Sequence, residues 1–247
     1  MVKKNRTSTD VIDCACVIHS TGYDWIYVER LYNMLCRNLD HNIRFHVYTE
    51  ADRSVPDSMI KHVLTEWPGV SGPKRSWWYK MQLFNREHHQ GNLLYFDLDT
   101  VIVRDISWIT QLPAEKLWTI RDFRRLQAKN WSGMNSSVMW WNVSEYHWIW
   151  EKFSQSNVET TIQQHRQGDQ DYIMKAIGHN NIRFFEDSAM QSWRWQIWEG
   201  GIQFPYRHTN KPGAGAVIPD NTSVLVFHGQ PKPHELLDNV VIKQHWI

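Results

Sequence analysis

The chain has 247 residues, and 27 Lys and Arg against 26 Asp and Glu give it a net charge of +1. Its charged residues, 21% of the total, are spread along the chain, which argues against a phosphate-tracking nucleic-acid surface. The hydrophobic content of 42% excludes a mainly disordered chain, and the length allows one large domain with a substantial core.

Neither a membrane span nor a secretory leader is predicted. No apolar run approaches the roughly 18 residues that a transmembrane helix needs. The charged opening MVKKNRTSTD is not followed by an apolar stretch of the kind that signal peptides contain. The three cysteines, Cys14, Cys16 and Cys36, form neither an even disulfide set nor a paired CxxC metal frame. We therefore expect reduced core thiols and a cytoplasmic protein.

The first 50 residues predict a strand, a helix and a second strand. Residues 11–18 are apolar enough for a buried strand, and residues 43–50 resemble it. Between them, residues 25–39 carry apolar side chains at a helical period. Because a strand, helix, strand unit of this kind crosses over to a parallel neighbour, we predict a parallel sheet.

The rest of the chain continues the alternation. A helix is expected to begin near Ser76, and residues 92–96, NLLYF, form a short buried strand that ends in DLD. Further strands are expected at residues 101–103, 117–120, 136–142 and 224–229, and helices after Ser144 and at residues 169–178. Residues 211–220, KPGAGAVIPD, are expected to form a flexible loop. We therefore predict one α/β domain with two lobes.

The DLD sequence carries the strongest chemical signal. Asp97 and Asp99 are two residues apart at the carboxyl end of a strand, where open α/β sheets bind ligands. With Leu98 turned away, both carboxylates face one site. Two close carboxylates repel unless a cation or a proton lies between them, and hard divalent cations prefer oxygen ligands. The alternative, two acids exposed at a strand end, fits poorly with the four apolar residues before them.

Three more motifs follow the DLD in a familiar order: NSS at residues 135–137, GDQD at 168–171 and HGQPKP at 228–233. With these motifs the chain resembles the metal-dependent GT-A fold glycosyltransferases, most closely the retaining family 8 type that includes glycogenin and bacterial lipopolysaccharide galactosyltransferases. The resemblance covers about residues 10–235. It implies a Rossmann-like, mostly parallel sheet flanked by helices, with a nucleotide-sugar-binding lobe over about 10–105 and a donor-sugar and acceptor lobe over about 106–247.

The resemblance also implies a metal site and a donor. It implies that Asp97 and Asp99 hold Mn²⁺, or Mg²⁺, against the diphosphate of a UDP-sugar. It also implies that Lys232 binds a phosphate of the donor. The third metal ligand of the family is a histidine at the position where this chain has Val226. His228, two residues further along the strand, faces the same side and is our predicted ligand, with a simple turn histidine as the alternative.

Other residues match family positions around the donor. Lys80 matches a basic residue beside the donor, with a solvated helix lysine as the alternative. Tyr23 matches the aromatic residue that stacks on uracil, with Trp25 as its rival. The residues expected to contact the donor sugar are Asp122, Asn135 and Ser136. The alternative for Asp122 is an acid on the protein surface, and the alternative for Asn135 and Ser136 is a role in forming a turn.

Asp169 and Gln170 match the family pair beside the anomeric carbon, although Asp169 also suits the N-cap of the helix that it begins. Gln170 supports an oxocarbenium-like centre but is a poor nucleophile. A double displacement needs a carboxylate at the anomeric carbon, and the sequence leaves open whether Asp169 or Asp171 could supply it. We favour the front-face route that the family implies, in which the leaving phosphate oxygen takes the proton of the acceptor and the anomeric configuration is retained.

The acceptor, a saccharide or another hydroxyl compound, is expected near SWRWQIWEGG. Trp193 and Trp195 would lie on one face of an extended segment, with Trp198 nearby, and would form a stacking platform for a sugar. Packing of these side chains in the core or a lid is the alternative.

Two other functions fit parts of the sequence. FDLDTV matches the first motif of haloacid-dehalogenase-type phosphatases, in which Asp97 would be the nucleophile and Asp99 the acid and base. That motif normally lies on the first strand of its domain, whereas here nearly a hundred residues precede it. A carbohydrate-binding module with tryptophan platforms is the second alternative, but it leaves the DLD and G-x-x-K-P motifs without a role.

Overall fold

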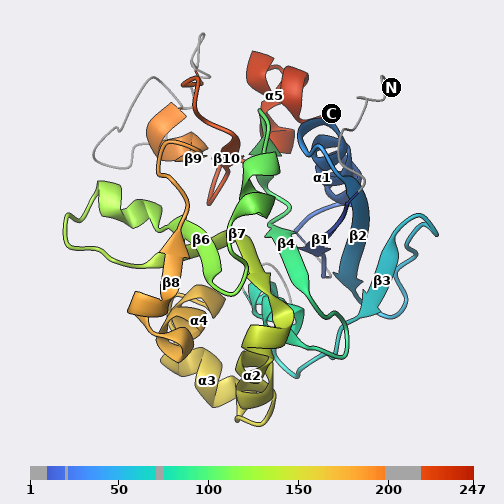
Figure 1. Cartoon of the computed structure of the whole chain (residues 1–247), viewed down its shortest axis with the longest axis vertical. Coiled ribbons are helices and arrows are strands. Elements are labelled where there is room, and N and C mark those ends of the chain that lie inside the picture. The colour runs from blue at the N-terminus through green and yellow to red at the C-terminus, as the bar shows by residue number, and fades with distance from the viewer. Residues whose placement is uncertain (1–9, 20–21, 71–74, 198–217) are drawn as a thin grey trace.

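A seven-stranded sheet forms the centre of the computed structural model, which describes residues 10–19, 22–70, 75–197 and 218–247 (Figure 1). The spatial order of its strands is β3 (Ile60–Val63), β2 (Asn42–Thr49), β1 (Val11–Val17), β4 (Asn92–Phe96), β7 (Met134–Asn142), β6 (Leu117–Arg121) and β8 (Ile182–Phe184). The pairs from β3 to β4 are parallel, β7 is antiparallel to both of its neighbours, and β6 and β8 are parallel to each other. The predicted mostly parallel sheet is confirmed.

Alternation along the strands gives the sheet two buried faces. Cys14 and Cys16 of β1 belong to one hydrophobic cluster, and Ala15 between them belongs to the other. Strand residues buried on both faces are typical of a parallel sheet covered by helices on each side. All three cysteines are free, as predicted, but only Cys14 and Cys16 are core thiols, because Cys36 in the first helix is only partly buried.

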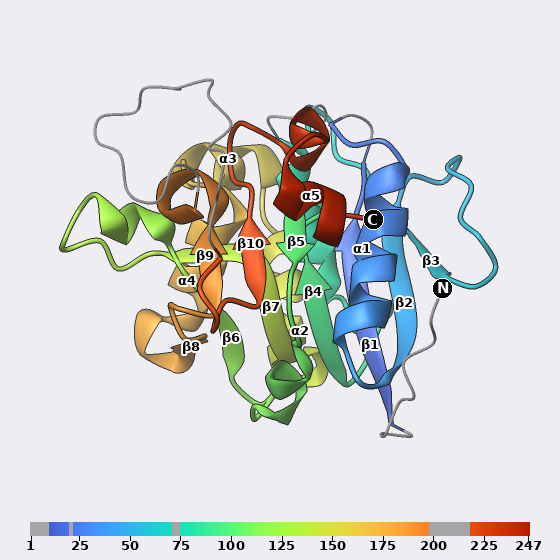
Figure 2. The same cartoon turned by 90° about the horizontal axis from the view of Figure 1, so that it is seen from above.

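Two different layers cover these faces (Figure 2). One face packs against α1 (Ile26–Asn38), α5 (Val240–His245) and a small second sheet of β5 (Thr100–Ile102), β10 (Val224–Val226) and β9 (Met190–Ser192). The other face packs against the 3₁₀ helix η1 (Ser76–Phe84), α2 (Val143–Ser154) and α4 (Asp169–Ile177), with α3 (Val158–Gln164) beside α2. The short turns η2 (Ser107–Gln111), η3 (Phe123–Leu126), η4 (His179–Asn181), η5 (Trp193–Ile197) and η7 (Pro233–Leu236) link these elements.

The segment that begins at Ser76 is a helix, as predicted, but of the 3₁₀ type. Its residues from Trp78 to Phe84 are all buried, including Lys80 and Gln82. The segment therefore lacks the polar face that a surface α-helix presents, and the sheet and α2 enclose it. Residues 211–217 of the predicted loop lie outside the described residues. Within the described part, no helix is both long and apolar enough to cross a membrane.

The order of the strands places a ligand site at one edge of the sheet. From β1 the chain runs outward through β2 and β3, and it then returns to place β4 on the opposite side of β1. The strand order therefore reverses between β1 and β4. Open α/β sheets bind ligands at such a reversal, beside the carboxyl ends of the strands.

Candidate active site

A cleft of about 540 Å³ lies at the carboxyl ends of β1 and β4. Ile18 and His19 line it just after β1, and Asp97 and Asp99 line it just after β4. The predicted site residues found in its lining are Tyr23, Lys80, Asp97, Asp99, Asn135, Ser136, Asp169, Gln170, His228 and Lys232. The fold thus brings residues from all parts of the chain to the sheet edge that the sequence indicates.

The turn after β4 fixes the two aspartates. The backbone N–H of Asp97 donates to the carbonyl of Ser137 at 2.7 Å, and the carbonyl of Asp97 accepts from the hydroxyl of Thr100 at 2.7 Å. Leu98 is 3% exposed and belongs to the hydrophobic core, but it also borders the cleft, so the prediction that it turns away from the site is only partly correct. The hydroxyl of Tyr95 donates to Asp97 Oδ1 at 2.5 Å. Hydrogen bonds on its backbone and side chain therefore hold Asp97 in place.

Lys80 is the buried cation of the site. Its Nζ lies 2.9 Å from Asp97 Oδ1 and 3.6 Å from Asp169 Oδ2, and it donates to the hydroxyl of Ser136 at 3.0 Å. The side chain is only 8% exposed. Burial lowers the pKa of Lys80, but the carboxylates of Asp169 and Asp97 outweigh this effect and hold the pKa above its usual value. Lys80 therefore stays charged and links η1 to the ends of β4, β7 and α4.

Asp99 is bound by a second lysine. Lys232 Nζ donates to Asp99 Oδ2 and also to the carbonyl of Phe227 at 3.1 Å. The hydroxyl of Tyr23 donates to the same carboxylate oxygen at 2.9 Å. Trp25, the rival of Tyr23, lines a neighbouring pocket of about 530 Å³ that Tyr23 also borders. Of the two aromatic residues, Tyr23 is therefore the one in contact with the DLD turn.

The start of α4 contributes Asp169 and Gln170. Gly168 occupies the N-cap position with φ of +82°, so Asp169 is the first helical residue and not the cap, contrary to our expectation. The carboxylate of Asp169 instead accepts from the hydroxyl of Ser136 at 2.6 Å, and the residue is 3% exposed. Burial raises the pKa of Asp169, while Lys80 and Ser136 oppose the increase. Asp169 is thus a buried acid held by the polar groups of the cleft.

Asn135 and Ser136 lie in β7 next to an irregularity of the sheet. The register between β6 and β7 shifts at Thr119 and Ile120, opposite this part of β7. The side-chain oxygen of Asn135 accepts from the backbone N–H of Ser137 at 3.1 Å. A bulge of this kind changes the direction of side chains at the end of a strand. Both Asn135 and Ser136 line the cleft.

His228 lines the cleft, but its ring is bound elsewhere. Its Nε2 lies 2.7 Å from the hydroxyl of Ser192, and the ring stacks on Phe123 at a centroid distance of 5.2 Å. Burial lowers the pKa of His228 to about 4, so the ring is neutral at physiological pH. Metal ions are commonly bound by His, Cys, Asp and Glu side chains. Among the described residues, one group of three such side chains has its potential ligand atoms within 4.8 Å of one another. That set is not the predicted trio of Asp97, Asp99 and His228.

Asp122 differs from the other predicted residues because it is absent from the lining of the cleft. One of its carboxylate oxygens accepts from the backbone N–H of Arg124 at 3.0 Å, at the start of η3. The other accepts from the indole N–H of Trp131 at 2.8 Å. These contacts give Asp122 a local role in the loop after β6.

The predicted tryptophan platform is wrong in its geometry. Residues 193–197 form a π-helical turn and not an extended segment, so Trp193 and Trp195 do not alternate on one face. Trp193 is 1% exposed and stacks on Phe227 in the core. Trp195 is partly buried and meets the ring of His228 edge-on at 4.6 Å. Trp198 lies outside the described residues.

Several cleft residues were not predicted, among them Tyr95, Trp77 and His234. Tyr95 was identifiable, because it precedes Asp97 by two positions in one strand and so faces the same side. Trp77 lies beside the start of α4, since a Cβ on Gly168 would lie 2.7 Å from the indole nitrogen of Trp77. His234 follows the G-x-x-K-P motif and contacts the hydroxyl of Tyr27. No local pattern in the sequence indicates the last two.

Comparison with solved structures finds known glycosyltransferases that match 90–94% of this chain. The chain is similar to galactosyltransferase LgtC in complex with donor and acceptor sugar analogues, with a TM-score of 0.65 and 14% identity over 94% of this chain and 93% of that one. It is also similar to the glycosyltransferase GlyE of Streptococcus pneumoniae TIGR4, with a TM-score of 0.56 and 15% identity over 90% of this chain and 56% of that one. Mouse xyloside xylosyltransferase 1 matches with a TM-score of 0.50 and 12% identity over 90% of this chain and 100% of that one.

The sequence alone gives no comparable match: no protein-family model matches the chain, and no curated protein does either. At 12–15% identity, the similarity to the solved structures shows the fold. The chain therefore has the GT-A fold, as the motifs predicted.

Proposed function

We propose that the chain is a metal-dependent glycosyltransferase that transfers a hexose, glucose or galactose, from a UDP-sugar to a hydroxyl group of a saccharide or similar acceptor. The GT-A fold and the position of the cleft at the reversal of strand order support this function. The pocket of about 530 Å³ that shares Tyr23 with the cleft is the proposed place for the nucleoside.

The charge of the cleft is the observation that carries the proposal. The cleft contains three carboxylates and two lysines, so its formal charge is 2 − 3 = −1. The carboxylates are those of Asp97, Asp99 and Asp169, and the lysines are Lys80 and Lys232. A diphosphate adds more negative charge, and like charges in a partly buried site repel strongly. A nucleotide donor therefore needs an additional cation when it binds here.

Asp97 and Asp99 fit a hard divalent cation such as Mn²⁺ or Mg²⁺, because such ions prefer carboxylate oxygens. His228, which lines the same cleft, remains the proposed third ligand. When bound, the cation neutralises the charge that develops on the leaving diphosphate. Lys232 Nζ donates to Asp99, so a cation held by that carboxylate would compete with this contact, and Lys232 would then be available to bind a phosphate oxygen.

The carboxylates near the donor sugar favour the front-face route with retention. Asp171 is held by His165 Nδ1 at 3.1 Å and Lys175 Nζ at 3.0 Å, and it does not line the cleft. Asp169 lines it, but its carboxylate is bound to Ser136 and lies beside Lys80. A carboxylate bound in this way is a weak nucleophile, so we propose that Asp169 and Gln170 orient the sugar and support positive charge at the anomeric carbon. The leaving phosphate oxygen then takes the proton of the acceptor.

The two alternatives receive less support. The phosphatase motif belongs on the first strand of its domain, whereas β1, β2 and β3 all precede the strand that carries Asp97 here. A tryptophan platform for a binding module requires exposed parallel rings, but Trp193 is buried in the core.

The test is release of UDP from a panel of UDP-sugars in the presence of Mn²⁺, with added saccharide acceptors. We expect release to require Mn²⁺ and to fall by at least about 100-fold in Asp99→Asn, because loss of a ligand should cost at least as much as loss of its outer partners. Asp238→Asn is the control, because that exposed carboxylate pairs only with Lys243 at 3.3 Å among the ion pairs of the described chain. The configuration of the product, followed by NMR, tests retention.

Other results would refute the assignment. Release of phosphate from phosphomonoesters, without turnover of any UDP-sugar, would favour the phosphatase. Binding of saccharides without turnover would favour the binding module. Full activity of Asp99→Asn, or full activity after removal of divalent cations, would exclude the proposed role of the DLD pair.

A further inference from the structure

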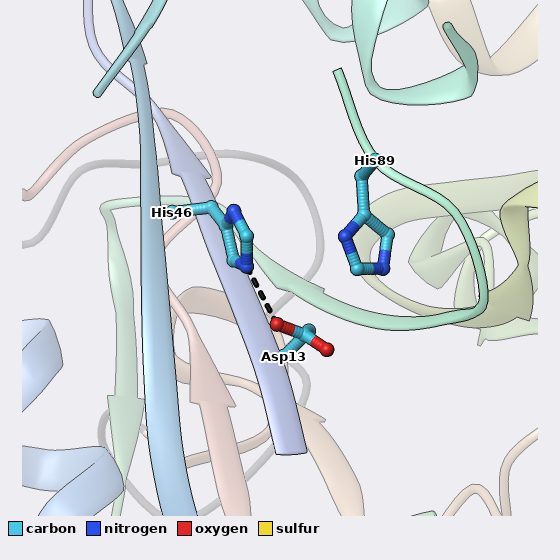
Figure 3. Close-up of side chains that lie close together, drawn as sticks. All are labelled: Asp13, His46 and His89. Atoms are coloured by element: carbon cyan, nitrogen blue, oxygen red, sulfur yellow. Dashed lines mark hydrogen bonds and ion pairs between the residues drawn. The ribbon is translucent and has the colours of Figure 1, made fainter. Parts of the chain in front are cut away.

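Three buried side chains converge beside β1, away from the cleft (Figure 3). Asp13 lies in β1, His46 in β2, and His89 in the segment between η1 and β4. Each offers one ligand atom within 4.8 Å of the others, and none is more than 9% exposed. Nε2 of His46 lies 2.7 Å from Asp13 Oδ1, and Figure 3 shows the His89 ring turned toward this pair. We call these three residues the β1 triad.

The β1 triad is separate from the candidate active site. None of its members lines the cleft. Asp13 precedes Val17, at the end of β1, by four residues, which is about 13 Å along a strand. An ion bound by the triad would therefore not contact a donor held at Asp97 and Asp99.

Neighbouring groups hold the remaining polar atoms of the triad. Nε2 of His89 lies 3.2 Å from the carbonyl of Asn92, which leaves Nδ1 of that ring on the side of Asp13 and His46. Nδ1 of His46 lies 2.8 Å from Nε2 of His62, which leaves Nε2 for the triad. Contacts of this kind orient the histidine ligands of metal sites and fix the ring nitrogen that faces the ion.

Arg44 completes the surroundings of Asp13. Its Nη2 donates to Asp13 Oδ2 at 2.7 Å, and its Nε donates to Oδ1. The Arg44 side chain is 53% exposed, so it can keep its bond to Oδ2 while Oδ1 turns to another partner. If Oδ1 of Asp13 and Nε2 of His46 both held an ion, the His46 proton would reside on Nδ1, which lies 2.8 Å from Nε2 of His62.

We propose that the β1 triad binds one Zn²⁺ ion, with a water molecule as the fourth ligand. One carboxylate oxygen and two imidazole nitrogens are a ligand set that zinc accepts readily, whereas Mg²⁺, Mn²⁺ and Ca²⁺ prefer oxygen ligands alone. The ligands come from β1, β2 and the segment that follows η1, so the ion joins three parts of the fold. An ion that binds only the folded chain raises its thermal stability.

The test uses the full chain after dialysis against a chelator. Zn²⁺ is added in competition with a coloured chelator, and the stoichiometry, the affinity and the shift in melting temperature are measured. Co²⁺ is then substituted, because its visible absorption reports a tetrahedral site with nitrogen ligands. We expect one tight equivalent, a higher melting temperature, and an affinity at least about 100-fold lower in His89→Gln.

Two control variants locate the ion. His88→Gln changes the adjacent histidine, which is not part of the triad, and is expected to leave the affinity unchanged. Asp99→Asn is expected to retain the tight equivalent, which separates this site from the proposed catalytic cation and makes the test independent of the proposed function. His62→Gln, which removes an outer partner, is expected to weaken binding by about 10–100-fold.

The proposal fails if the folded wild-type chain binds no Zn²⁺ tightly, or if His89→Gln and wild type bind it equally well. It also fails if Asp99→Asn loses the tight equivalent, because zinc would then occupy the cleft. If His89→Gln does not fold, the weakening expected in His62→Gln and the tetrahedral Co²⁺ spectrum of the wild type decide the question.

Discussion

Replacement of Lys80 by methionine tests whether the buried lysine holds the cleft together. Methionine keeps most of the length and apolar volume of the side chain and removes only the charge. In the native cleft, Nζ lies 2.9 Å from Asp97, 3.6 Å from Asp169 and 3.0 Å from the hydroxyl of Ser136. The variant therefore leaves two carboxylates close together without the cation that lies between them.

The size of the effect follows from the burial of these groups. The side chains of Lys80 and Asp169 are 8% and 5% exposed, so water compensates little for the lost charge. Removal of one partner from a buried ion pair costs about 3–5 kcal/mol. For a chain of this length each kcal/mol shifts the melting temperature by about 2–4 °C, so we expect a decrease of about 6–20 °C at neutral pH.

The loss should also depend on pH. Burial already raises the pKa of Asp169, and removal of Lys80 raises it further. A raised pKa means that the folded chain binds the proton of Asp169 more tightly than the unfolded chain does. Proton binding therefore stabilises the folded chain fully below the ordinary aspartate pKa of 3.8. This stabilisation is lost as the pH rises through the pKa of Asp169 in the folded chain. The difference in melting temperature between Lys80→Met and wild type should therefore be largest at neutral pH and should narrow toward about pH 4.

The assay is thermal unfolding followed by circular dichroism across this pH range, with Lys175→Met as the matched control. Lys175 also pairs with an aspartate, Asp171 at 3.0 Å, but it is 58% exposed on α4. Exposed pairs of this kind contribute about 0.2–0.5 kcal/mol. If Lys80→Met melts within a degree or two of Lys175→Met at neutral pH, or if its deficit grows in acid, the described charge balance is wrong.

Three further predictions concern Lys232, which lines the cleft, and Gly168 and Asp122, which lie outside its lining. Lys232→Met removes the group that competes with a cation for Asp99, so Mn²⁺ should bind more tightly in the absence of nucleotide, while UDP should bind more weakly. Paramagnetic resonance measures the affinity for Mn²⁺, and calorimetry measures the affinity for UDP. Weaker binding of Mn²⁺ would contradict the proposed competition between Lys232 and the cation. Gly168→Ala forces a side chain into a backbone with φ of +82° and places a Cβ 2.7 Å from the indole nitrogen of Trp77, so urea unfolding should show a loss of about 1–3 kcal/mol. Asp122→Ala should cost about 1–2 kcal/mol, because its carboxylate accepts two local hydrogen bonds, and should leave the KM for the donor unchanged; a raised KM at unchanged stability would return Asp122 to the donor site.

Hydrophobic periodicity and sequence motifs predicted the central part of the fold, because both depend on residues that are close together in the sequence. The buried strands β1 and β4 are short apolar runs, and the amphipathic α1 repeats its apolar residues every three to four positions. Parallel pairing then brings the carboxyl ends of β1 and β4 to one edge, which is why the DLD turn could be placed before its surroundings were known.

The features that were missed depend on contacts between distant segments. The π-helical turn at Trp193 has no period of its own, and it forms where Trp193 can stack on Phe227, more than thirty positions away. The β1 triad combines residues from three separate segments, and no spacing in the sequence marks it. The N-cap of α4 is Gly168 and not the predicted Asp169. The buried carboxylate of Asp169 accepts a hydrogen bond from Ser136 and does not cap the helix.

The two lysines of the cleft differ in the groups that they contact, and this difference bears on how the proposed donor would bind. Lys80 is a buried residue of η1 and contacts Asp97, Ser136 and Asp169, from three different parts of the fold. Its side chain cannot move out of the cleft without leaving buried carboxylates unpaired. Lys232 follows the positive-φ residue Gly229 and binds Asp99 and one carbonyl of its own segment. Under the proposed function, a diphosphate with its cation would therefore replace the Lys232 contact while the Lys80 contacts remain. This arrangement keeps one half of the site preorganised and makes the other half exchangeable, which is why the variants of these two lysines are expected to fail in different assays.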